Sequence, residues 1–93
     1  MGNRVTIQRT VFKNYGKTEE TFGFRMYDDY GQSYSNCIPE EQLKLPDEDF
    51  FNLVCDEYSD ENSSVMIDWV LEHGCYIDST WYEAKELMEW RGE

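Results

Sequence analysis

Carboxylates are the most abundant reactive side chains of this chain of 93 residues. Twenty aspartates and glutamates outnumber eight lysines and arginines, which gives a formal net charge of −12. Nine of the acids fall between residues 40 and 61, where Lys44 is the one basic residue. Clustered carboxylates can bind Ca²⁺, perform acid–base catalysis or attract a basic surface. The spacing of the acids decides which of these kinds of chemistry the chain can perform.

The spacing does not fit a metal site or a catalytic site. An EF-hand loop that begins at Asp56 needs a glycine and later a glutamate where the chain has Glu61 and Ile67. A loop that begins at Asp60 fails in the same way. One histidine and three cysteines without paired spacing do not predict a zinc site, and no glycine-rich phosphate loop is present. We therefore expect no metal, no cofactor and no enzymatic activity, although incidental cation binding by the acidic segment stays open.

The three cysteines, Cys37, Cys55 and Cys75, lack the C-x-x-C spacing of a redox or metal motif. We interpret them as reduced thiols that pack as small apolar residues. His73 is close to Cys75 in sequence, but nothing indicates the oriented base and the pocket that a cysteine nucleophile needs. The chain also lacks an apolar secretory segment or a membrane span of about 18 residues. We therefore expect a soluble protein of the cytoplasm, in a bacterial host cell.

These side chains must be positioned by elements whose hydrophobic period changes near residue 40. Residues 4–12, 20–27 and, more weakly, 32–38 alternate between apolar and polar side chains, which predicts strands. Arg9 interrupts the apolar face of the first strand. Residues 14–17 and 28–31 carry the asparagine, aspartate and glycine that favour turns. The first forty residues are therefore predicted to form an antiparallel meander of about three strands.

After residue 40 the apolar residues follow a helical period. Pro46 and the acids after it predict the start of a helix that ends near Tyr58, followed by a polar break over residues 59–64. A second helix is expected over residues 64–73 with Gly74 as its cap, and a last helix ends near residue 90. Residues 80–82 either form a small hairpin or begin the last helix. The sequence thus predicts a single α+β domain over residues 1–93, with two to three C-terminal helices packed on the meander.

The charge divides at the same place as the period. Residues 1–36 have a net charge of +1, whereas residues 37–93 have a net charge of −13. Acids also recur at every third position at Glu83, Glu86 and Glu89, a spacing that slightly destabilises a helix. Two interpretations stay open. The acids form a solvated face that keeps the protein soluble, or they stand in for nucleic-acid phosphates and compete for a basic groove.

Tyrosine and tryptophan are more numerous than a small core needs, and both are preferred anchors in protein interfaces. The tip of the second hairpin combines such aromatics with acids. Most of the aromatics can also be explained as parts of the core. The candidate partner-binding residues are Asp28, Asp29, Tyr30, Glu40, Glu41, Asp47, Glu48, Asp49, Asp56, Glu57, Asp60 and Glu61.

In length, charge, the acid cluster from Asp47 to Glu61 and the high content of tyrosine and tryptophan, the chain resembles small acidic proteins of phages and mobile elements. These include anti-CRISPR and anti-restriction proteins, several of which mimic DNA. The resemblance implies an inhibitor that occupies a basic nucleic-acid-binding surface of a defence complex. The net charge of −12 predicts that the protein itself binds neither nucleic acid nor a membrane. The slightly basic first third departs from the most acidic mimics. The alternative is a non-enzymatic adaptor or subunit that binds a protein partner through exposed aromatics.

Overall fold

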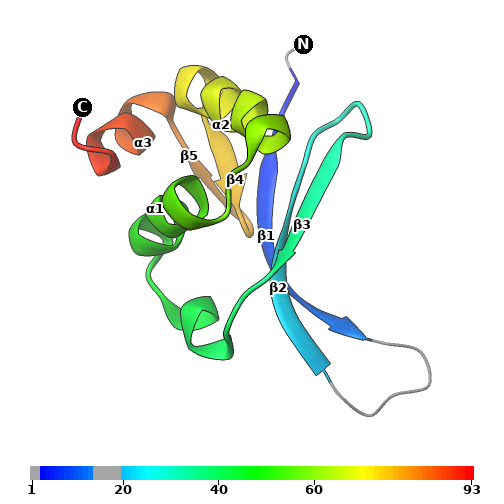
Figure 1. Cartoon of the computed structure of the whole chain (residues 1–93). Coiled ribbons are helices and arrows are strands. Elements are labelled where there is room, and N and C mark those ends of the chain that lie inside the picture. The colour runs from blue at the N-terminus through cyan, green and yellow to red at the C-terminus, as the bar shows by residue number, and fades with distance from the viewer. Residues whose placement is uncertain (1–2, 14–19) are drawn as a thin grey trace.

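The computed structural model describes residues 3–13 and 20–93, and it has an α+β fold in which helices cover one face of a sheet (Figure 1). The strands are β1 (Thr6–Lys13), β2 (Glu20–Tyr27), β3 (Ser33–Cys37), β4 (Cys75–Ile77) and β5 (Thr80–Tyr82). The helical segments are the 3-10 helix η1 (Glu40–Lys44) and the helices α1 (Asp47–Glu57), α2 (Glu61–His73) and α3 (Ala84–Trp90). The strand order β3-β2-β1-β4-β5 places the N-terminal strand at the centre of the sheet.

The N-terminal meander is confirmed. β1 pairs with β2 and β2 pairs with β3, both antiparallel, so that Ile7 lies opposite Met26 on the face that the helices cover. The predicted turn over residues 14–17 lies outside the described residues. The turn after β2 is present, and the Asp28 N–H donates to the Gln32 carbonyl at 3.1 Å.

The sheet has two more strands than the sequence predicts. Residues 80–82 form a hairpin with residues 75–77, which was one of the two interpretations above. β4 then pairs parallel to β1, where the Tyr76 N–H donates to the Val5 carbonyl at 2.9 Å. A strand of three residues is too short for its sequence to show an alternation of apolar and polar side chains. The side chains of Cys75 and Ile77 are both fully buried, which stabilises β4 in the sheet.

The boundaries of α1 are confirmed, but the start of α2 was predicted three residues too late. α2 begins at Glu61 because Asp60 is its N-cap. The Asp60 carboxylate accepts the backbone N–H groups of Asn62 and Ser63 at 2.9 Å, and the Ser63 hydroxyl accepts the Asp60 N–H at 2.8 Å. This reciprocal pair is a capping box with serine in the place of the usual glutamate, so the polar segment belongs largely to the helix.

The core lies between the sheet and the helices. Phe24 of β2 contacts Phe50 of α1 edge to face, with ring centroids 5.8 Å apart. Leu87 of α3 is a fully buried member of the same core. Gly74 ends α2 as predicted. Its φ of 85° and the Tyr82 carbonyl, 2.6 Å from where a Cβ would stand, admit only glycine there.

None of the helices within residues 3–13 and 20–93 covers the opposite face of the sheet, and we call it the open sheet face. Strand alternation and register place the following side chains on it: Thr6, Gln8, Thr10 and Phe12 of β1, Thr21, Gly23, Arg25 and Tyr27 of β2, Ser33, Ser35 and Cys37 of β3, Tyr76 of β4 and Trp81 of β5. None of these residues is acidic and one, Arg25, is basic. The sheet therefore separates an acidic helical layer from a face without strand acids.

Candidate functional site

The acids at the tip of the β2–β3 hairpin are bound within the fold. One carboxylate oxygen of Asp28 accepts the backbone N–H groups of Tyr30 and Gln32, each at 2.9 Å. The carboxylate of Asp29 accepts the Arg4 backbone N–H at 2.9 Å. These bonds shape the turn and attach the N-terminal segment to it. Tyr30 is different, because 76% of its surface is exposed.

Asp47 is bound to Arg9, the residue that interrupts the apolar face of β1. The Arg9 side chain points into the helical layer and is only 16% exposed. Its Nη1 donates to the carbonyls of Leu43 and Leu45 at 3.2 and 2.7 Å, and its Nε donates to Asp78 at 2.9 Å. Its Nη2 pairs with both Asp47 and Asp78.

This set of bonds, which we call the Arg9 network, uses four of the five N–H groups of the guanidinium in hydrogen bonds and adds the ion pair between Nη2 and Asp78. The second Asp47 oxygen accepts the hydroxyl of Tyr82, a bond that raises the pKa of this tyrosine to about 12. Through these contacts Arg9 joins β1 to η1, to the start of α1 and to the β4–β5 turn. Asp47 therefore serves the fold, and its carboxylate is not available to a partner.

Asp56 and Asp60 also have partners within the chain. Asp56 pairs with Arg91 at 2.6 Å, and this bond holds the pKa of the Asp56 carboxyl below its usual value of 3.8. The pKa of Asp60 is lowered by the backbone N–H of Ser63 in the capping box. Both interactions require the ionised carboxylate, so they stabilise the fold at neutral pH and are lost as the pH falls through the folded-state pKa values.

Six candidate acids are exposed and have no side-chain hydrogen bond or ion pair within residues 3–13 and 20–93. We call them the acidic surface: Glu40, Glu41, Glu48, Asp49, Glu57 and Glu61. They follow η1, α1 and the first turn of α2, on the helical side of the sheet. The structure thus divides the candidate acids into five that bind a partner within the fold and six that have none among the described residues.

The side-chain length of the acids would have indicated this division. All five bound acids are aspartates, and five of the six acids of the acidic surface are glutamates. An aspartate carboxylate is one methylene from its own backbone, so it reaches nearby backbone N–H groups in turns and caps. A glutamate reaches them less readily and extends into solvent. Sequence reasoning treated the two residue types alike.

Most of the candidate aromatic anchors belong to the core. Tyr34, Tyr58, Tyr82 and Trp90 pack against the buried cluster, and Trp81 lies under the guanidinium of Arg4 at 6.0 Å. On the hairpin, Tyr27 and Tyr30 keep a large exposed surface. Glu83, one of the three regularly spaced acids near the C-terminus, precedes α3 and accepts the indole N–H of Trp81 at 2.9 Å.

No hydrogen bond joins His73 to a cysteine among the described residues. The imidazole of His73 stacks on the indole of Trp69, with ring centroids 3.9 Å apart. Burial raises the pKa of the Cys55 thiol to about 11 and that of Cys75 to about 12, so both are protonated at neutral pH. Within the described ranges, no group of histidine, cysteine and acidic side chains is arranged to hold a metal ion.

Thiol reactivity gives a direct check of this arrangement. Iodoacetamide at pH 8 is expected to alkylate Cys37, which is exposed at the edge of the sheet, and to leave Cys55 and Cys75 unmodified in the folded protein. In denaturant all three should react. Intact-mass and peptide mass spectrometry counts the adducts, and rapid native labelling of Cys75 would contradict the packing of β4 described above.

Searches against protein-family models, curated proteins and solved structures found no match to this chain. None of the helices in the described part of the chain is long and apolar enough to cross a membrane.

Proposed function

We propose that this protein is an acidic inhibitor that occupies a basic, nucleic-acid-binding surface of a protein or ribonucleoprotein defence complex. The acidic surface is the proposed contact. The observation that supports it most is the division of charge across the sheet, with unpaired carboxylates along η1, α1 and α2 and no strand acid on the open sheet face. A uniform solubilising charge would not require such a division.

The physical basis of the proposal is competition with phosphates. Duplex DNA presents about one negative charge per 1.7 Å of its axis, and a protein groove that binds it is lined with lysine and arginine. Carboxylates held on helices meet such a groove without the entropic cost of ordering a flexible chain. The net charge of −12 also accelerates encounter with a basic surface. We place this activity in the cytoplasm of a bacterial host, where a phage or mobile element would need it.

A second candidate function is that of an adaptor or subunit that binds a protein partner through aromatic side chains. Tyr30 supports it, because a tyrosine exposed at a hairpin tip contributes little to folding and is a preferred interface anchor. Truncation of Tyr30 to alanine would then weaken partner binding more than any change in the acidic surface.

Salt dependence tests the proposed function. We expect the tagged chain to retain its partner from a bacterial lysate at about 50 mM salt and to lose it by about 300 mM, because charge-driven contacts weaken steeply with ionic strength. The same capture with Tyr30→Ala separates the two candidate functions. Retention at high salt together with loss in the Tyr30→Ala variant would replace the inhibitor with the adaptor.

A further inference from the structure

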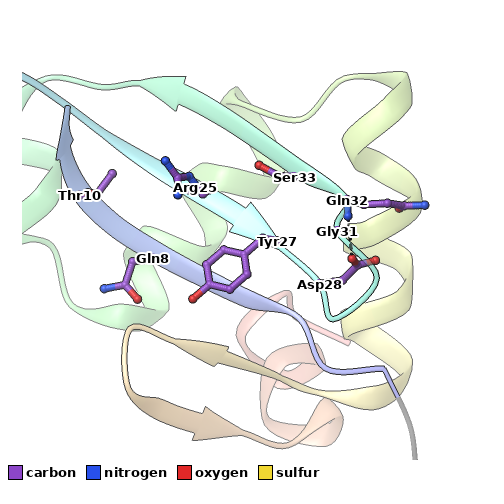
Figure 2. Close-up of a pocket in the computed structure, with 8 residues that line it drawn as sticks. All are labelled: Gln8, Thr10, Arg25, Tyr27, Asp28, Gly31, Gln32 and Ser33. Carbon is purple, nitrogen blue, oxygen red and sulfur yellow. Dashed lines mark hydrogen bonds between the residues drawn. The ribbon is translucent and has the colours of Figure 1, made fainter. Parts of the chain in front are cut away.

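The open sheet face contains a hollow, and none of the residues that line it belongs to the acidic surface. Its floor is formed by β1 and β2, and the turn after β2 forms one wall (Figure 2). In Figure 2 the side chains of Gln8, Thr10, Arg25 and Tyr27 point away from the helices, toward the same opening. The register explains this convergence, because Arg25 lies directly opposite Gln8 on β1, and Tyr27 lies opposite Ser33 on β3.

Arg25 is the basic group of this hollow, and its situation differs from that of the other described arginines. Arg9 and Arg91 form ion pairs with aspartates, and Arg4 covers the ring of Trp81. Arg25 is exposed, and its guanidinium has no hydrogen bond or ion pair to any described residue. The Arg25 guanidinium therefore makes no polar contact with the described part of the fold and is available to a ligand.

The remaining polar groups of the hollow can assist in binding an anion. Thr10 and Ser33 offer hydroxyl groups and Gln8 offers an amide, all of which donate hydrogen bonds. The lining carboxylate, Asp28, is already used by backbone N–H groups of the turn and by the amide of Asn3 at 3.3 Å. The hydroxyl and amide groups can both donate and accept, so the preference for an anion comes from Arg25, whose guanidinium fork is the strongest donor and accepts nothing.

Tyr27 adds a planar surface next to this donor set. It is exposed to 36% and lies two residues after Arg25 on the same face of β2, a separation of about 7 Å along a strand. One small ligand can therefore place a planar ring against Tyr27 and an oxyanion against Arg25. Aromatic stacking contributes about 1–3 kcal/mol for a nucleobase and does not depend on its identity.

We propose that this hollow binds a small ligand that joins a planar ring to an oxyanion, of the nucleoside monophosphate class, with Arg25 holding the oxyanion and Tyr27 stacking on the ring. A single nucleotide is favoured over a long strand by the charge of the whole protein. The Debye length is about 8 Å at physiological ionic strength, so a ligand confined to the hollow is screened from the acids on the helical side. A strand that extends past the hollow meets the field of a protein with a net charge of −12.

The test is a titration of the full-length chain, labelled with ¹⁵N, with adenosine monophosphate. We expect saturable shifts of the backbone signals of Gln8, Arg25, Tyr27 and Ser33. The Arg25→Gln variant should weaken binding about tenfold or more, the usual loss for a charged hydrogen bond. Tyr27→Leu should weaken binding of the nucleotide but not the weaker binding of inorganic phosphate. Lys44→Gln, which removes an exposed cation on the helical side, is the matched control and should change nothing.

Three further ligands decide the outcome. Weaker binding of adenosine supports the role given to the oxyanion, whereas equal binding of adenosine would overturn it. An aromatic carboxylate that matches the nucleotide would extend the ligand class to carboxylates and supports the shared chemistry. Tighter binding of an eight-residue oligothymidylate would assign the face to single-stranded nucleic acid and overturn the proposal. Absence of saturation in the millimolar range, or an unchanged affinity in Arg25→Gln, would also overturn it. The site is independent of the proposed inhibitor function, because it lies on the other face of the sheet.

Discussion

Replacement of Arg9 by methionine is expected to lower the free energy of unfolding by about 3 kcal/mol, the lower end of the cost of leaving a buried charge without its partner, because these charges are only partly buried. The change removes every bond of the Arg9 network and leaves Asp47 and Asp78 facing each other without a cation. In a domain of this size such a loss corresponds to a fall in Tm of about 12–25 °C, which thermal denaturation followed by circular dichroism measures.

Two further variants make this prediction specific. Arg25→Met removes an arginine from the neighbouring strand on the open sheet face and should change the free energy of unfolding by less than about 0.5 kcal/mol. Adding Asp47→Asn and Asp78→Asn to Arg9→Met should restore part of the lost stability, because the uncompensated charges disappear with their carboxylates. A loss for Arg9→Met no larger than that for Arg25→Met would show that the Arg9 network does not stabilise the fold.

Reversal of four glutamates of the acidic surface is expected to weaken partner binding at least about 100-fold, or about 2.7 kcal/mol. The variant carries Glu40→Lys, Glu41→Lys, Glu48→Lys and Glu57→Lys, which changes the net charge from −12 to −4. These side chains are exposed and have no partner among the described residues, but Glu40, Glu41 and Glu48 lie in the first turns of η1 and α1, so we expect a loss of stability of only about 1–2 kcal/mol. Binding to the captured partner, measured by surface plasmon resonance at fixed salt, gives the ratio.

The control for this variant has the same net charge at another place. Asp68→Lys, Glu72→Lys, Glu89→Lys and Glu93→Lys together also give −4, but these acids belong to the later part of α2 and to the C-terminal segment. We expect this control to lose much less affinity. If both variants lose binding equally, the field of the whole protein, and not the acidic surface, attracts the partner.

Much of the fold could be predicted because its longer elements show a clear hydrophobic period. The eight residues of β1 and of β2 alternate, and α1 begins after Pro46 with three acids in its first turn. The start of α2 was missed because a capping box formed by Asp60 and Ser63 has the composition of a loop. The parallel pairing of β4 with β1 joins residues about seventy positions apart, and no local pattern records it.

The sequence predicted which segment of the chain is acidic, but not how its individual acids are used. The sequence indicates that residues 40–61 are acidic, but it does not indicate that Asp47 faces a half-buried arginine or that Asp56 faces Arg91. Both pairs join distant segments, so they follow from tertiary packing. The strand that carries Arg25 and Tyr27 was predicted, but its uncovered face was not. That face follows from the tertiary structure, in which α1, α2 and α3 lie on the other side of the sheet.

The most direct test of the central claim is whether the protein and nucleic acid exclude each other on the partner. The purified partner is loaded with fluorescent duplex DNA, and the chain is added while fluorescence anisotropy is recorded. The proposed function predicts that the DNA is released in step with binding of the chain, and that the variant with four reversed glutamates releases none at the same concentration. A stable complex in which the partner holds the DNA and the chain together would contradict the claim that the acidic surface occupies a nucleic-acid-binding site.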